Sequence, residues 1–219
     1  MISVLLADDH TIVRKGLASL LRSETDIEVI GEAENGRQAV SCALELSPNV
    51  LVMDIGMPIL NGLEATRQIL QSVKGCKIII LSAYSDDANI EKVIAVGASG
   101  YLVKQTSSHN LPEAIRKVHA GETHFSPIIS QRVSHLRRNG STDATLGPGL
   151  TLREMEVLQL IAEGNPNKIT ADILCLSIKT VEKHRQNIMR KTGMHDASGL
   201  TRYAISEGII ESGLPPSLT

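Results

Sequence analysis

The sequence predicts an α/β domain with a doubly wound, five-stranded parallel sheet, followed by a smaller all-α domain that contains a helix-turn-helix. Three observations lead to this prediction. The chain has 219 residues, enough for two domains that each bury a core. Short apolar runs alternate with amphipathic segments as far as Ala120. A turn-rich segment then precedes four short helical patterns.

The expected strands of the first domain are short, continuously apolar runs: Ile2 to Ala7, Ile27 to Gly31, Val50 to Met53, Ile78 to Leu81 and Tyr101 to Val103. Apolar residues spaced by three and four predict the helices between them: Ile12 to Arg22, Arg37 to Leu46, Gly62 to Gln71, Ala88 to Val96 and Leu111 to Ala120. Continuously apolar strands separated by helices imply a parallel sheet that is covered on both faces, with right-handed crossovers.

Composition excludes several classes of protein. With 42% hydrophobic and 21% charged residues, the chain resembles neither a disordered nor a fibrous protein. The first residues lack the pattern of a signal peptide, and no later window approaches the roughly 18 apolar residues of a membrane span. Cys42, Cys76 and Cys175 are too few and too far apart for a disulfide framework or a paired zinc site. We therefore expect a cytoplasmic protein without a membrane partner.

Polar side chains follow four of the expected strands where each strand ends. Asp8 and Asp9 follow the first strand, Asp54 the third, Ser82 the fourth and Lys104 the fifth. Ligands of such sheets collect beyond the carboxyl ends of the strands, so these side chains should lie close together. Carboxylates packed so closely repel one another unless a cation lies among them, and an all-oxygen site suits Mg²⁺. A divalent ion beside an ammonium group also provides a place for a phosphoryl group.

These strand ends resemble the receiver domains of bacterial two-component response regulators, and with the C-terminal domain the chain resembles the NarL/FixJ branch. The resemblance covers almost the whole chain, and it implies a flavodoxin-like receiver domain over residues 1–122. Its motifs are Ala7-Asp8-Asp9-His10, Met53-Asp54-Ile55-Gly56-Met57-Pro58 followed by Gly62, Leu81-Ser82-Ala83, and Gly100-Tyr101-Leu102-Val103-Lys104.

The resemblance implies a role for each residue of the acid cluster. Asp54 would accept a phosphoryl group from a sensor histidine kinase and form an acyl phosphate. Asp8, Asp9, Asp54 and the backbone carbonyl of Gly56 would hold Mg²⁺ as the cofactor. The protein would then be a phosphoacceptor that catalyses only its own phosphotransfer and dephosphorylation, and not an enzyme in the usual sense.

Three further positions complete the site that the resemblance implies. Lys104 would pair with a phosphoryl oxygen, Ser82 would hydrogen-bond to the phosphorylated form, and Tyr101 would change its exposure at the same time. Tyr101 is also consistent with an ordinary core aromatic. Gln105 follows Lys104 where many receivers have a proline, which leaves the local backbone geometry undetermined.

Two alternatives apply to the first domain. A single aspartate at a strand end is most often a helix cap or a solvated residue, but suitable residues at four strand ends make coincidence improbable. An aspartate-based phosphohydrolase shares this fold, but such enzymes typically need a second acid two residues after the nucleophile. That position is Gly56 in this chain.

Residues 123–149 are the expected linker. A short helix over Pro127 to Arg138 is consistent with the sequence, and the run from Asn139 to Gly149 is rich in turn-forming residues. The second domain is expected over residues 150–211, with a tail over 212–219. Capping signals predict its four helices: Thr151 with Glu154 before a helix to Glu163, Asn165 and Pro166 before a helix to Leu174, Ser177 before a helix to Thr192, and Asp196 before a helix to about Gly208.

The third of these helices is basic, although the net charge of the whole chain is −2. Val181 and Ile188 should face inward. The opposite face would present Lys179, Glu182, Lys183, Gln186 and Arg190. Cations neutralise phosphates, whereas Lys, Gln and Glu side chains can address base edges in the major groove. A charged helix face is by default merely solvated, so periodicity alone does not establish DNA binding.

This domain resembles the LuxR-type helix-turn-helix. The matching residues are Leu150 to Leu158, Gly164, Asn167-Lys168 and Ser177-Ile178-Lys179-Thr180-Val181-Glu182-Lys183-His184. The resemblance implies double-stranded promoter DNA as a partner. Glu182, Lys183 and Gln186 would face bases, and Lys179, Thr180, Arg185 and Lys191 would face phosphates.

The chain departs from the LuxR-type pattern at Ile169-Thr170 and at Thr192, which should loosen packing without changing the recognition face. His184 lies on the apolar side of its helix, where a core position is at least as consistent as a phosphate contact. The active form is expected to be a homodimer joined through the fourth helix, Ala197 to Glu207. The rival interpretation is a signalling adaptor whose helical domain binds protein.

Overall fold

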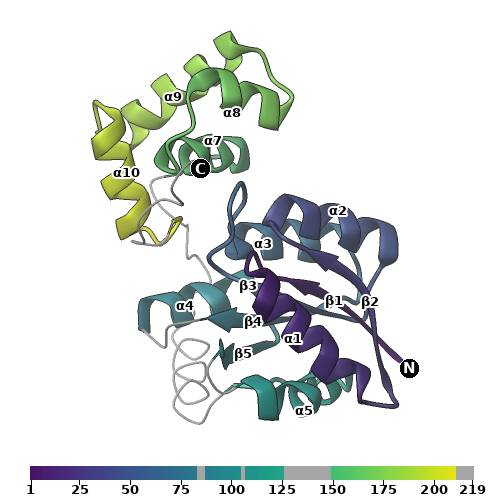
Figure 1. Cartoon of the computed structure of the whole chain (residues 1–219). Coiled ribbons are helices and arrows are strands. Elements are labelled where there is room, and N and C mark those ends of the chain that lie inside the picture. The colour runs from purple at the N-terminus through teal and green to yellow at the C-terminus, as the bar shows by residue number, and fades with distance from the viewer. Residues whose placement is uncertain (83–86, 105–106, 126–148, 211–219) are drawn as a thin grey trace. The chain divides into compact units, whose positions relative to one another are not determined.

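The computed structural model describes residues 1–82, 87–104, 107–125 and 149–210, and the chain divides into two compact units, Met1–Ala144 and Thr145–Thr219 (Figure 1). The side chains of residues 87–89 and 107–109 are outside the description. Gln105 and the expected helix over residues 127–138 also lie outside the described residues. Within the described part of the chain, no helix combines the length and apolarity needed to cross a membrane.

A five-stranded parallel sheet forms the centre of the first unit, as the sequence predicts. Its order is β2-β1-β3-β4-β5. The second strand is therefore added on one side of β1, and the later strands are added on the other side. Crevices in open α/β sheets form at this kind of switch point, beyond the carboxyl ends of the neighbouring strands. The strands are β1 (Ile2–Ala7), β2 (Ile27–Ala33), β3 (Val50–Asp54), β4 (Lys77–Ser82) and β5 (Gly100–Val103).

Helices cover both faces of the sheet because alternate strand residues point to opposite faces. Leu5 and Ala7 pack with residues of α2, α3 and α4, whereas Val4 and Leu6 pack with residues of α1 and α5. The helices are α1 (Thr11–Arg22), α2 (Gly36–Leu46), α3 (Gly62–Ser72), α4 (Asp87–Val96) and α5 (Ser107–His119). α5 begins four residues earlier than predicted, since Ser-Ser-His-Asn offers no apolar periodicity.

β2 continues two residues beyond its predicted end, through Glu32 to Ala33. Its register with β1 shifts between Val4 and Leu5, and pairing then continues to Ala33. The backbone N–H of Asp8 donates to the carbonyl oxygen of Ala33 at 3.1 Å. The end of β2 therefore lies beside the first acidic residue of the site.

The turn between β3 and α3 is held close to the end of the sheet by Gly62. Its backbone N–H donates to the carbonyl oxygen of Ile55 at 2.9 Å. A Cβ atom at this position would lie 1.8 Å from the carbonyl oxygen of Asp54. Only glycine allows this approach, and it brings the start of α3 next to Asp54.

The chain after α5 returns to the free edge of β5. The N–H of Tyr101 donates to the carbonyl of His124 at 2.9 Å, and the N–H of His124 donates to the carbonyl of Ser99 at 3.0 Å. Phe125 packs against the core cluster that contains Tyr101. Residues 124–125 are therefore in contact with β5, which contains the predicted site residue Tyr101 and is followed directly by Lys104.

Over residues 149–210, the second unit contains four helices: α7 (Leu152–Ala162), α8 (Asn167–Leu174), α9 (Ile178–Thr192) and α10 (Ala197–Ser206). Fully buried apolar residues form its core, among them Val157, Leu158, Leu160, Val181, Ile188 and Leu200. The predicted Thr151–Glu154 capping box and the caps Ser177 and Asp196 are confirmed.

The predicted cap of α8 is wrong. α8 begins at Asn167 with Pro166 at its N-cap position, and it has no side-chain cap. Asn165 instead donates from its side chain to the carbonyl oxygen of Leu160 at 3.1 Å. It thereby satisfies a carbonyl group near the end of α7, which has no partner within that helix. The same side chain is then not available to cap α8. α10 also ends earlier than predicted, at Ser206.

Candidate functional site

The carboxyl ends of β1 and β3 bring Asp8, Asp9 and Asp54 together. With His10, these residues offer ligand atoms that all lie within 4.8 Å of one another. Asp8 and Asp54 are almost completely buried, and Asp9 is half-buried. We call Asp8, Asp9 and Asp54 the acid cluster.

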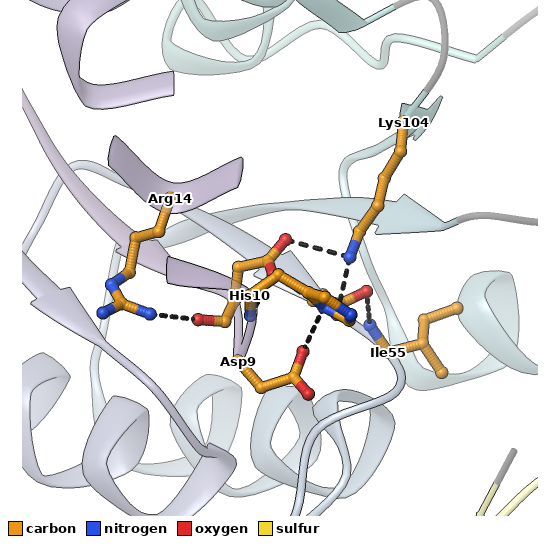
Figure 2. A network of polar contacts seen from close by, with 7 residues as sticks. Asp9, His10, Arg14, Ile55 and Lys104 are labelled. Carbon is orange, nitrogen blue, oxygen red and sulfur yellow. Dashed lines mark hydrogen bonds and ion pairs between the residues drawn. The ribbon is translucent and has the colours of Figure 1, made fainter. Parts of the chain in front are cut away.

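Lys104, from the end of β5, reaches the acid cluster across the sheet. Its Nζ lies 2.8 Å from Oδ2 of Asp54 and 2.9 Å from Oδ2 of Asp8 (Figure 2). The other carboxylate oxygen of Asp54 accepts a hydrogen bond from the backbone N–H of Ile55 at 2.8 Å. The orientation of the Asp54 carboxylate is therefore fixed from both sides.

Burial and charge act in opposite directions on the two central groups. Burial is the main reason that the pKa of Asp54 is raised to about 6; Lys104 opposes this shift, and the charges on Asp8 and Asp9 add to it. Burial alone would lower the pKa of Lys104, but contacts with Asp54 and Asp8 outweigh it and raise that pKa. At neutral pH the pair is thus a carboxylate next to an ammonium group.

The acid cluster fits a hard divalent cation. Its three side chains supply only carboxylate oxygens, and the deeply buried Asp54 has a raised pKa, which indicates that positive charge at this place would stabilise the ionised form. Mg²⁺ prefers oxygen ligands and commonly binds through one or two carboxylates. The residues present therefore match the cofactor that the sequence predicts.

Ser82 and Gly56 also lie at this edge of the sheet, whereas Tyr101 lies within β5, opposite Ile80 of β4. Asp54 pairs with Leu81 in the β3–β4 register, so Ser82 lies one residue beyond it, and Ser82 is itself opposite Val103 of β5. Ser82 and Tyr101 are both buried. Gly56 lies in the turn two residues after Asp54 and is half-buried.

Two residues in contact with the acid cluster are absent from the predicted site. Nδ1 of His10 lies 2.7 Å from Oδ1 of Asp9, and the backbone N–H of His10 donates to Oδ1 of Asp8 at 2.8 Å. Arg14 donates to the backbone carbonyl oxygen of Asp8 at 2.7 Å (Figure 2). A signal for Arg14 exists in the sequence, because helical spacing from Leu17 and Leu21 places it on the apolar face of its helix.

The second candidate site is the exposed face of α9. Val181 and Ile188 are buried on its inner face. The exposed residues on the other side include four of the predicted DNA contacts: Lys179, Glu182, Lys183 and Gln186. The structure thus brings these four side chains to one solvent-facing side of a single helix.

The other three predicted DNA-contact residues form hydrogen bonds or an ion pair with residues of the second unit. The Thr180 and Ser177 hydroxyl groups lie 2.8 Å apart, and Arg185 donates to Oδ1 of Asn167 at 3.3 Å. Nζ of Lys191 lies 2.6 Å from Oε2 of Glu154. These three residues are half-buried.

The two neighbouring departures from the LuxR-type pattern, Ile169 and Thr170, differ in burial. Thr170 is fully buried, and its hydroxyl group has no hydrogen-bond partner among the described residues. Ile169 exposes 42% of its surface. His184 is half-buried, and its Nδ1 atom is buried without a partner in the described part of the chain.

Both units match known families. Residues 4–116 match the response regulator receiver domain, and residues 148–204 match the luxR family of bacterial regulatory proteins. The chain is 42% identical to the transcriptional regulatory protein LiaR of Bacillus subtilis (strain 168), over 93% of this chain and 97% of LiaR. It is 36% identical to the response regulator protein VraR of Staphylococcus aureus (strain NCTC 8325 / PS 47), over 96% of this chain and 99% of VraR.

Solved structures agree with these matches over nearly the whole chain. The RcsB response regulator of Salmonella typhimurium is 28% identical with a TM-score of 0.59, covering 94% of this chain and 98% of RcsB. A structure of two RcsB dimers bound to two parallel DNAs matches at 26% identity with a TM-score of 0.57 and the same coverage.

Proposed function

Because this chain belongs to the NarL/FixJ family of two-component response regulators, we propose that Asp54 is its phosphoacceptor and that its LuxR-type unit binds promoter DNA as a homodimer. A sensor histidine kinase is the proposed donor of the phosphoryl group. The protein is a transcription regulator by family, and contact with chromosomal DNA would place its action in the cytoplasm.

The proposed phosphotransfer uses the carboxylate of Asp54 as nucleophile. A carboxylate oxygen forms a bond to phosphorus while the phosphorus–nitrogen bond of a kinase phosphohistidine breaks, and the imidazole nitrogen takes up a proton. Lys104, which already contacts Asp54, would form an ion pair with an oxygen of the phosphoryl group. Mg²⁺ held by Asp8, Asp9, Asp54 and the carbonyl of Gly56 would neutralise charge on the phosphoryl group.

The observation that carries this proposal is the bridge from Lys104 to both Asp54 and Asp8 at 2.8 and 2.9 Å. A helix cap or a solvated aspartate does not need a buried ammonium group from a distant strand. Ser82 and Tyr101 would respond to the new charge on Asp54, because Ser82 ends the neighbouring strand and Tyr101 belongs to the next one.

Mass spectrometry after incubation with acetyl phosphate and Mg²⁺ tests the acceptor directly. We expect the mass of one phosphoryl group on the wild type and none on Asp54→Ala. Asp172→Ala, which alters an exposed acid in the other unit, should be labelled like the wild type. Labelling of Asp54→Ala would rule out the assignment.

The same experiment separates this proposal from an aspartate-based phosphohydrolase. A hydrolase would turn over small phosphate esters many times, whereas a phosphoacceptor takes up one phosphoryl group for each chain. The position of the hydrolase acid is Gly56, which carries no side chain to act as acid or base. This favours the phosphoacceptor.

The proposed DNA surface is the exposed face of α9. Glu182, Lys183 and Gln186 would read base edges, and Lys179, Thr180, Arg185 and Lys191 would approach phosphates. Lys191, Arg185 and Thr180 also hold contacts within the unit, so replacing them should change stability as well as affinity. The structure of RcsB dimers on DNA supports a dimer as the binding form.

Salt dependence distinguishes DNA binding from an adaptor that binds protein. Phosphate contacts release counterions, so affinity for DNA should fall steeply between about 50 and about 200 mM salt. We expect this slope for phosphorylated protein on a DNA site selected in vitro. Absence of DNA binding at low salt would favour the adaptor.

A further inference from the structure

Arg14 is a buried cation next to the acid cluster. It lies in α1 with only 8% of its surface exposed, on the face that also buries Leu17, Ala18 and Leu21. A guanidinium group stays charged at any pH that a protein tolerates, so its burial requires strong partners. A position used only for packing would favour a leucine here.

The partners of Arg14 come from two different strands. Its Nη1 donates to the backbone carbonyl oxygen of Asp8 at 2.7 Å (Figure 2). Its Nε donates to Oε2 of Glu32 in β2 at 3.0 Å. Glu32 lies in the part of β2 that follows the register shift with β1. The side chain of Arg14 thus connects the end of β1 to the end of β2.

The carbonyl group that Arg14 holds is part of the peptide unit between Asp8 and Asp9. A peptide unit is planar, so the orientation of this carbonyl also sets the orientation of the Asp9 N–H. On its other side, the N–H of Asp8 is held by the carbonyl of Ala33 at 3.1 Å. Fixing this peptide therefore limits the directions in which both carboxylates leave the backbone.

Glu32 has a second effect, which concerns charge. A lone guanidinium group beside the acid cluster would repel a divalent cation. The carboxylate of Glu32 balances that charge while it also orients Arg14. The two side chains can therefore hold the backbone without adding net positive charge next to the acid cluster.

We propose that Arg14 and Glu32 are a positioning pair, which fixes the Asp8–Asp9 peptide and so increases the affinity of the acid cluster for Mg²⁺. Neither residue would touch the metal or the phosphoryl group. Groups that orient metal ligands commonly change metal affinity when they are replaced. This inference rests on the proposed function, because it assumes that the acid cluster binds Mg²⁺.

The test is a titration of the full-length, ¹⁵N-labelled protein with Mg²⁺ alone, followed by the backbone amide signals of Ile55 and Gly56. We expect Arg14→Met to weaken Mg²⁺ binding by about tenfold. The Mg²⁺ concentration for half-maximal labelling by acetyl phosphate should rise by the same factor, while the rate at saturating Mg²⁺ stays close to that of the wild type. The Mg²⁺ affinity of Arg14→Lys should lie between those of the wild type and Arg14→Met, because one ammonium group replaces the several N–H donors of the guanidinium group.

Arg116→Met is the matched control. Arg116 pairs with Asp26 at 2.6 and 2.8 Å and with Glu24 at 2.5 Å, in contact with the segment that precedes β2. Its removal breaks an exposed guanidinium–carboxylate contact in the same unit, away from the acid cluster. We expect its Mg²⁺ affinity to equal that of the wild type.

The possible outcomes are distinguishable. If Arg14→Met folds and its Mg²⁺ affinity equals that of Arg116→Met, the pair only fastens α1 to β2 and the inference is wrong. If Arg14→Met does not fold, Glu32→Gln and Arg14→Lys decide, and wild-type affinity in both overturns the inference. A wild type that neither binds Mg²⁺ nor becomes labelled contradicts the proposed function instead.

Discussion

At the scale of single residues, the tightest constraint near the acid cluster is Gly62. A Cβ atom there would lie 1.8 Å from the carbonyl oxygen of Asp54, so the backbone of the β3–α3 turn would have to move. We expect Gly62→Ala to destabilise the first unit by about 3 kcal/mol and to reduce labelling of Asp54. Chemical unfolding followed by circular dichroism measures the first effect, and mass spectrometry the second.

Gly16→Ala is the control for this substitution. Gly16 is an exposed residue inside α1, and nothing lies within 4 Å of the Cβ that alanine would add. This change should stabilise the unit by about 0.5–1 kcal/mol, because alanine loses less backbone entropy in a helix. If Gly62→Ala were as stable as Gly16→Ala, the close approach to Asp54 would not exist in solution.

Thr170 is a second residue with a testable consequence. Its hydroxyl group is fully buried and has no hydrogen-bond partner among the described residues. Thr170→Val keeps the shape and removes the unsatisfied group, so we expect the second unit to gain about 1 kcal/mol. Unfolding of the full chain, followed by amide signals of the second unit, measures the change.

Thr192→Val provides the opposite case. The hydroxyl group of Thr192 donates to the carbonyl of Ile188 at 2.9 Å and accepts from the N–H of Met194 at 3.3 Å. Its loss should cost about 1 kcal/mol. If Thr170→Val and Thr192→Val changed the free energy of unfolding equally, hydrogen bonding of the threonine hydroxyl group would not decide the stability of the second unit.

At the scale of elements, Glu154 joins the start of α7 to the end of α9. Its Oε2 accepts from the N–H of Thr151 at 2.8 Å and from Nζ of Lys191 at 2.6 Å. Burial alone would raise the pKa of Glu154, but the contacts with Lys191 and Thr151 outweigh it and lower that pKa below its ordinary value of 4.5. We expect Glu154→Gln to destabilise the second unit by about 1–2 kcal/mol at neutral pH.

The pH dependence of that difference follows from the direction of the shift. A lowered pKa in the folded state means that the contribution of Glu154 is complete above pH 4.5 and is lost as the pH falls through the folded pKa. The stability difference between the wild type and Glu154→Gln should therefore shrink in acid. The control is Glu182→Gln, which makes the same substitution on the exposed face of α9. A difference that stays constant in acid would contradict the role of the ion pair.

At the scale of the whole molecule, each unit has its own buried core, so the second should fold without the first. If the first unit inhibits by covering the exposed face of α9, deleting residues 1–145 should free DNA binding from phosphorylation. The fragment should bind a selected DNA site at least as tightly as the phosphorylated full chain at matched dimer concentration. Lys183→Ala should weaken both, and gel-shift titrations measure each affinity.

A different outcome would assign a different mechanism to the first unit. If the fragment binds much more weakly and forced dimerisation restores its affinity, phosphorylation acts by bringing two DNA-binding units together. The alternative, in which the first unit covers the exposed face of α9, would then be wrong.

The sequence by itself determined the succession of strands and helices along the chain and the residues of the acid cluster. Asp8, Asp54 and Lys104 each follow an apolar run, and parallel strands place their carboxyl ends at one edge of the sheet, so local patterns were sufficient. Capping residues such as Thr151 and Ser177 could also be predicted, because the side chain of a cap bonds to a backbone N–H only a few residues away.

The tertiary structure alone decided the contacts between distant segments. Helical spacing placed Arg14 on a buried face, but its contact with Glu32 depends on the extension of β2 beyond its predicted end and on the shifted register with β1. Asn165 was predicted as a cap, and it instead satisfies a carbonyl of α7. In both cases a polar group had several possible partners along the chain, and packing of the core determined which of them came within hydrogen-bonding distance.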